Sequence, residues 1–105
     1  MRTLKFIVTA QKLEKDPSCD LSGIVSGTKG YLFAEFSFSK EWEGTVKVAE
    51  FKKRRRSETI PVPIINGRCE IPNDVLTGTK FFIRVIGKNG SYKITTNECF
   101  IKQEG

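Results

Sequence analysis

The chain has 105 residues, and its 18 Lys and Arg against 12 Asp and Glu give a formal net charge of +6. A chain of this length supports one hydrophobic core, so residues 1–105 are expected to form a single domain. Hydrophobic residues make up 38% of the chain and include eight Phe, which excludes disorder by composition. No apolar run approaches the roughly 18 residues of a membrane-spanning helix, and the first residues lack a signal peptide's apolar stretch. We therefore expect no membrane association.

The residue types that are missing narrow the chemistry further. The sequence contains no histidine, which removes the commonest general base and the His-containing triads and metal sites. The cysteines Cys19, Cys69 and Cys99 form no C-x-x-C pair and are expected to be ordinary free thiols, with one disulfide left open. No carboxylates occur at a favoured catalytic spacing, and no glycine-rich nucleotide motif is present. We expect no enzyme activity, no cofactor and no bound metal.

Alternation of apolar and polar side chains predicts strands along most of the chain. In chain order, the predicted strands cover residues 4–10, 31–39, 45–52, 60–65, 69–71, 81–85 and 91–102. In the third of these, Val46 and Val48 share an apolar face until Phe51 breaks the parity, which is typical of a β-bulge. Apolar faces expected to form the core include Leu4, Phe6, Val8, Leu32, Ala34, Phe36, Phe38, Ile60, Val62, Ile64, Phe81, Ile83 and Val85.

Turn residues separate these strands. The dipeptides Asn66-Gly67 and Asn89-Gly90 predict tight hairpins with both residues in the left-handed region. One short helical turn is expected near 73–76, between strands. The predicted fold is all-β: an immunoglobulin-like antiparallel β-sandwich of about seven strands. A small closed barrel is the alternative, because alternation alone does not distinguish the two.

A run of five cations, Lys52, Lys53, Arg54, Arg55 and Arg56, is the most conspicuous feature of the sequence. Without it the formal net charge would be +1, so the basic excess is concentrated at one predicted loop. The run has three interpretations: a solvated hairpin tip, a docking element for an acidic patch of a protein partner, or a phosphate-binding element for nucleic acid. No aromatic residues interleave with it and no recognition helix is present, which disfavours nucleic acid without excluding it.

Trp42 lies where a predicted strand ends in a polar corner. One interpretation is a core-capping aromatic whose indole N–H binds a backbone carbonyl, and the other is an anchor in a protein interface. With Tyr31 and Tyr92, Trp42 would also be the platform of a carbohydrate-binding module. These two tyrosines lie on separate segments, so this third hypothesis has weak support from the sequence.

Over residues 24–102 the order of segments resembles the small β-sandwich domain of tailed-phage virion proteins, namely upper baseplate, tail-fibre N-terminal and head-fibre-like proteins. The residues that carry the resemblance are Phe36-Ser37 with Trp42 and Gly44, Cys69-Glu70-Ile71-Pro72 followed by Val75-Leu76, Val85 with Gly87, and Ile94-Thr95-Thr96-Asn97. Each of these residues has a packing or turn role, so the pattern indicates architecture before function.

The resemblance implies a non-enzymatic virion structural or adaptor protein, made in the bacterial cytoplasm and assembled into the virion. Its implied partners are other virion proteins, and symmetric homo-oligomers are common in the family. Larger members continue into a trimerising region, so this chain is expected to be either a small virion protein or the N-terminal domain of a longer one. The alternative is a small phage-encoded regulator that binds a host protein or nucleic acid through residues 52–56.

Overall fold

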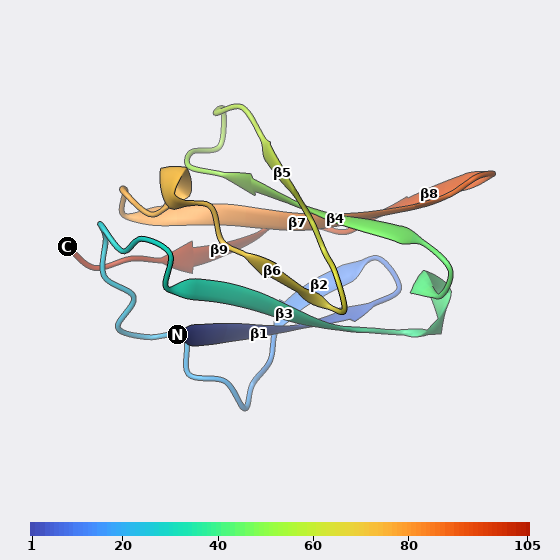
Figure 1. Cartoon of the computed structure of the whole chain (residues 1–105), viewed down its shortest axis with the longest axis horizontal. Helices are drawn as coiled ribbons and strands as arrows, with labels where there is room; N and C mark the ends of the chain where they lie inside the picture. The colour runs from blue at the N-terminus through green and yellow to red at the C-terminus, as the bar shows by residue number, and fades with distance from the viewer.

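Two β-sheets packed face to face form the protein, in a computed structural model that describes all of residues 1–105 (Figure 1). The strands are β1 (Arg2–Thr9), β2 (Lys12–Lys15), β3 (Leu32–Phe38), β4 (Val46–Lys52), β5 (Ile60–Pro63), β6 (Arg68–Glu70), β7 (Lys80–Asn89), β8 (Tyr92–Thr95) and β9 (Cys99–Lys102). Two 3-10 turns, η1 (Lys40–Trp42) and η2 (Asn73–Val75), interrupt them. The all-β sandwich and the helical turn near residue 73 are confirmed. No helix has the length and hydrophobicity of a membrane span.

The first sheet has the strand order β2-β1-β3-β6 and contains one parallel pair. Strands β1 and β3 run side by side from Arg2↔Leu32 to Val8↔Phe38, whereas every other strand pair is antiparallel. A parallel pair needs a long connection, and residues 16–31 provide it after β2. The Arg2 guanidinium donates to three carbonyls of this connection, those of Asp20, Ser22 and Gly23, at 3.0, 2.6 and 3.3 Å.

The second sheet has the order β5-β4-β7-β8, and β9 also pairs with β7. Strand β7 is ten residues long and is the longest strand, so its free side accommodates two partners in succession. Strand β9 pairs with the half of β7 from Lys80 to Ile83, and β8 pairs with the half from Ile86 to Asn89. All residues on one face of β7 therefore share the outer surface of a single sheet.

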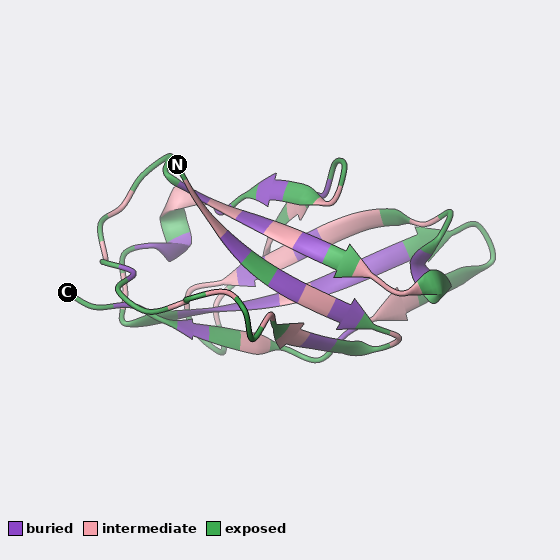
Figure 2. Cartoon of the chain, turned by 90° about the horizontal axis from the view of Figure 1, so that it is seen from below, coloured by how far each residue is buried: buried purple, intermediate pink, exposed green.

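Buried and more exposed residues alternate along the strands (Figure 2), and the buried apolar side chains form the core between the sheets, largely as the sequence predicts. The prediction is wrong for β4, where Ala49 and Phe51 are fully buried and Val46 is 74% exposed. There is no bulge, because the β4–β7 register runs unbroken from Val46↔Lys88 to Lys52↔Phe82. Burial of Phe51 fixes this register, since a one-residue slip would turn every side chain of the strand to the other face. Val46 and Val48 consequently lie on the outer surface.

The two Asn-Gly turns differ. Asn66 and Gly67 have φ values of +54° and +75°, so both adopt the predicted left-handed conformation. Asn89 instead ends β7 and pairs with Tyr92, which moves the turn forward by one residue to Gly90 and Ser91. The second hairpin is confirmed, but its predicted turn position is wrong because pairing extends through Asn89.

Strand β5 forms an edge of the second sheet that resists further pairing. The Ile64 N–H donates to the Lys47 carbonyl at 3.0 Å. The backbone N–H and C=O groups of the even-numbered residues in and next to β5 therefore point toward β4. Pro61 and Pro63 therefore take the positions on the free side, where they have no N–H to donate. This edge offers few hydrogen bonds to an added strand, so partner contacts are more naturally made by the faces of the sheets.

Candidate functional site

The basic run lies in the loop between β4 and β5, and its members have different environments. Lys52 Nζ lies 2.6 Å from the Glu98 carboxylate and also donates to the Arg55 carbonyl at 3.1 Å. Arg54, Arg55 and Arg56 are exposed, Lys53 is half-buried, and none of these four forms an ion pair. Lys52 is thus neutralised by a partner within the chain, and the unpaired charge of the loop begins at residue 53.

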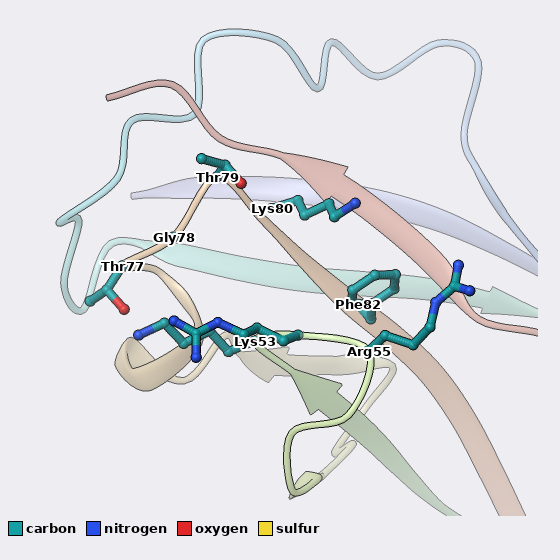
Figure 3. A pocket seen from close by; sticks show the side chains of 8 residues that line it. Lys53, Arg55, Thr77, Gly78, Thr79, Lys80 and Phe82 are labelled. Atoms are coloured by element: carbon teal, nitrogen blue, oxygen red, sulfur yellow. The ribbon is translucent and has the colours of Figure 1, made fainter.

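A pocket of about 430 Å³ lies between this loop and the segment that leads into β7 (Figure 3). Its lining, named here the basic pocket, consists of Lys53, Arg54, Arg55, Thr77, Gly78, Thr79, Lys80 and Phe82. Figure 3 shows Arg55 beside Phe82 on one side of the pocket and Thr77 on the other. No carboxylate lines it, and its charged side chains are all hydrogen-bond donors, so its chemistry favours an anion with several oxygen atoms.

Positive charge continues from the basic pocket along the outer face of the second sheet. Lys80, Arg84 and Lys88 follow one another at intervals of four along β7 and therefore share one face of that strand. Lys102 pairs with Lys80 and Lys93 pairs with Lys88, so these lysines lie on the same face. We name as the basic face the unpaired cations Lys53, Arg54, Arg55, Arg56, Lys80, Lys88, Lys93 and Lys102.

The strand portion of the basic face is not apparent from the sequence. The charge excess coincides with residues 52–56, because removing them leaves a net charge of +1. The signal that could have found the rest is the interval between Lys80, Arg84 and Lys88, which places all three on one face of a strand. The pairing of Lys80 with Lys102 depends on the register between β7 and β9 and has no counterpart in the sequence pattern.

Charged side chains are paired differently on the outer faces of the two sheets. On the first sheet, Glu35 lies opposite Lys5 on one side and Arg68 on the other, so unlike charges meet. On the second sheet, Lys80 lies opposite Lys102 and Lys88 lies opposite Lys93. Like charges directly opposite each other destabilise a sheet. The second sheet therefore carries a concentrated positive field that its own carboxylates do not balance.

One cross-strand ion pair interrupts the basic face. Arg84 Nε donates to the Glu50 carboxylate at 2.7 Å, from the strand position directly opposite. This neutralises Arg84 much as Glu98 neutralises Lys52. The cations that remain unpaired lie on either side of these two ion pairs, at the pocket and at the β7–β8 hairpin.

Two phenylalanines lie on the outer face beside the basic pocket. The Phe82 and Phe100 ring centroids are 6.4 Å apart, and Lys80 Nζ lies 5.6 Å from each of them. Lys15 Nζ lies 5.3 Å from the Phe100 centroid as well. These lysines make cation–π contacts with the rings, of which Phe82 is buried and Phe100 is 44% exposed.

Trp42 belongs to the core and not to the surface. Its side chain is fully buried, its ring packs 5.3 Å from that of Phe38, and its indole N–H donates to the Ala10 carbonyl at 2.8 Å. This is the core-capping arrangement, and it removes Trp42 from the candidate contact residues. For the same reason Trp42 cannot form part of the platform of a carbohydrate-binding module. Tyr31 and Tyr92 are both exposed, but Tyr31 adjoins the start of β1 and Tyr92 contacts Glu41 at the other end of the sandwich.

A groove lined by apolar and polar side chains lies at the end of the molecule distant from the basic pocket. It has a volume of about 470 Å³, and its lining includes Phe38, Val46, Ile64 and Ile65. Val46 and Ile65 are 74% and 67% exposed, which is unusual for large apolar side chains. Exposed apolar side chains that lie together mark candidate protein contacts.

The remaining reactive side chains form no composite site. Cys19, Cys69 and Cys99 are all free thiols, and burial raises the pKa of Cys69 to about 12. The structure brings together no group of three or more Cys, Asp or Glu side chains that could hold a metal ion.

Comparison with known proteins finds a solved structure with a similar fold. No protein-family model matches the sequence, and no curated protein matches it closely enough to be compared. Among solved structures, the chain is similar to the N-terminal domain of phage TP901-1 ORF48, with a TM-score of 0.53 and 12% sequence identity. The match covers 100% of each of the two chains. At this identity the similarity establishes a shared fold.

Proposed function

We propose that the chain is a structural or adaptor component of a tailed-phage virion, which joins other virion proteins through non-covalent contacts and performs no catalysis. The observation that carries the proposal is the fold similarity to a phage protein domain over the full length of both chains. The sequence resemblance to baseplate, tail-fibre and head-fibre domains is consistent with the same assignment. Because one fold can host several functions, the surface must supply the rest of the argument.

The surface supports a protein-binding role. The basic face provides charge complementarity for an acidic partner, and the groove with Val46 and Ile65 provides apolar area for a partner to cover. The basic pocket and the groove lie at opposite ends of the sandwich, and Lys88 of the basic face connects them because it lies directly opposite Val46. Two such regions suit a component that links neighbours, including further copies of itself.

A second candidate is a small phage-encoded regulator that binds a host protein or nucleic acid through the loop at residues 52–56. The unpaired cations of that loop favour it, since phosphates and acidic side chains both bind clustered Arg and Lys. The two candidates differ in where the protein is found after infection.

The test is the protein content of purified phage particles. We expect mass spectrometry of particles banded in a density gradient and washed in high salt to detect the chain in a fixed ratio to a major tail or head protein. Abundant chain in the infected cells with none in washed particles would overturn the virion role and favour the regulator. Light scattering of the purified chain would then determine whether it forms the symmetric oligomer that the resemblance implies.

A further inference from the structure

We propose that the basic pocket is a carboxylate-binding site that docks an acidic segment of a protein partner. The proposal rests on the proposed function, because a virion role supplies the partner. It adds the chemistry of recognition: Asp or Glu side chains enter between the β4–β5 loop and the segment 77–80.

The side chains that line the pocket suit a carboxylate ligand. Arg54 and Arg55 contribute planar guanidinium groups, which pair with carboxylates through two parallel hydrogen bonds. Thr77 and Thr79 add hydroxyl donors from the opposite wall. Glu98, the carboxylate bonded to this loop, is bound to Lys52 and does not line the pocket. The four cations of the pocket are thus free to bind an external anion.

Lys80 is the pocket cation whose charge and position the surrounding structure most affects. Lys80 lies directly opposite Lys102, a like-charge pair that costs stability until an anion screens it. Lys80 is also held over the Phe82 and Phe100 rings, which restricts its side chain. A bound carboxylate would therefore relieve this repulsion with little loss of Lys80 side-chain entropy, whereas the exposed Arg54 and Arg55 side chains would become ordered on binding.

The surroundings of the pocket favour an acidic protein segment over nucleic acid. Single-stranded nucleic acid binds through stacking on successive aromatic faces, but Phe82 is only 8% exposed, which leaves Phe100, at 44% exposed and with Lys15 and Lys80 beside its ring, as a single stacking surface at the pocket. Val46 and Ile65 leave apolar area exposed on the same molecule, which a protein partner can bury and a phosphate backbone cannot. Charge and apolar area together therefore favour a protein.

The experiment uses the full chain and a fluorescein-labelled hexaglutamate peptide, with binding followed by fluorescence anisotropy at low salt. The pocket variant carries Arg54→Ser, Arg55→Ser and Lys80→Ser. The matched control carries Lys5→Ser, Lys12→Ser and Lys29→Ser, three exposed lysines outside the basic face, so both variants lose the same net charge. We expect the pocket variant to bind about tenfold more weakly or worse and the control to change less than about twofold.

Three outcomes would overturn the proposal. These are no binding of hexaglutamate by the unaltered chain, equal weakening in both variants, and tighter pocket-dependent binding of labelled hexathymidylate than of the peptide. The second outcome would show an effect of net charge alone, and the third would assign the pocket to nucleic acid. Thermal unfolding of each variant confirms that the comparison is made between folded proteins.

A measurement on the virion separates this proposal from the proposed function. If the pocket variant enters particles as well as the unaltered chain, the docking role of the pocket is wrong and the virion role stands. If the unaltered chain binds hexaglutamate through the pocket but is absent from particles, the carboxylate site stands and the virion role is wrong.

Discussion

The buried indole ring of Trp42 restricts which residue can occupy position 87 of β7. Gly87 lies on the core side of β7, and a Cβ atom added there would lie 2.8 Å from both Cε3 and Cζ3 of Trp42. The ring has no room to move, because it is fully buried and its N–H is bonded to the Ala10 carbonyl. Glycine is therefore required at position 87 by packing and not by backbone conformation.

This contact predicts that Gly87→Ala lowers the free energy of unfolding by about 1–3 kcal/mol, the usual cost of overpacking a core. Gly78→Ala is the matched control, because an added Cβ at position 78 meets nothing closer than 3.8 Å. We expect urea unfolding of the control to differ by less than about 0.5 kcal/mol or to show slight stabilisation. Equal losses in both variants would contradict the Trp42 contact as the cause.

The cysteines provide a second prediction at this scale. Burial raises the pKa of Cys69 from 9.0 to about 12, and burial also raises the pKa of Cys99 although Lys15 opposes that rise. Because Cys69 ionises at lower pH in the unfolded chain than in the native protein, it contributes stability that is fully present below pH 9 and is lost as the pH rises toward 12.

In the native protein at about pH 8.5, thiol labelling followed by mass spectrometry should modify Cys19 before Cys69, since the thiolate is the reactive form. If Cys69 were labelled as fast as Cys19 without denaturant, its thiol would be accessible in the native protein and the prediction would be wrong.

Among the elements, Asn97 joins the two sheets at the side where β2 meets the β8–β9 connection. Its side-chain oxygen accepts from the Leu13 N–H at 2.8 Å, and its side-chain nitrogen donates to the Leu13 carbonyl at 3.2 Å. One side chain thus satisfies both backbone groups of Leu13 as a neighbouring strand would. This cross-link lies outside the regular ladders of either sheet.

Replacing Asn97 by Ala should lower the free energy of unfolding by about 1–3 kcal/mol, because two partly buried backbone groups lose their partners. Asn73→Ala is the control, since the Asn73 side chain accepts a single exposed hydrogen bond, from the Gly30 N–H at 3.0 Å. Hydrogen exchange of the Leu13 amide provides a local readout and should accelerate in the Asn97 variant alone. An unchanged hydrogen-exchange rate of the Leu13 amide would show that the Asn97 cross-link does not stabilise this part of the fold.

The sequence predicts contacts between residues that are close along the chain better than contacts between distant strands. The Asn66-Gly67 turn is set by adjacent residues and was predicted correctly. The parallel pairing of β1 with β3 was missed, because it depends on how residues 16–31 lead the chain back beside β1. The candidate site divides in the same way: the loop cations form one visible run, whereas Lys80 and Lys102 meet only through the β7–β9 register.

For the molecule as a whole, charge is arranged by face. Opposite charges meet across the first sheet, at Glu35 with Lys5 and Arg68, whereas the second sheet has two like-charge pairs, Lys80 with Lys102 and Lys88 with Lys93, beside the single ion pair of Arg84 with Glu50. The net charge of +6 therefore acts as a directed field from one surface of the sandwich. Such a field steers an acidic partner toward that surface and destabilises the isolated protein through self-repulsion.

This asymmetry predicts opposite effects for one type of substitution. Lys93→Glu places a carboxylate opposite Lys88 and should raise the free energy of unfolding by about 0.2–1 kcal/mol at low salt. Lys5→Glu places a carboxylate opposite Glu35 and should lower it by a similar amount, although both changes alter the net charge equally. In about 1 M NaCl the screening length falls to roughly 3 Å, so the two variants should converge in urea unfolding. If both variants shifted stability in the same direction at low salt, total charge and not its arrangement by face would govern the electrostatics of the fold.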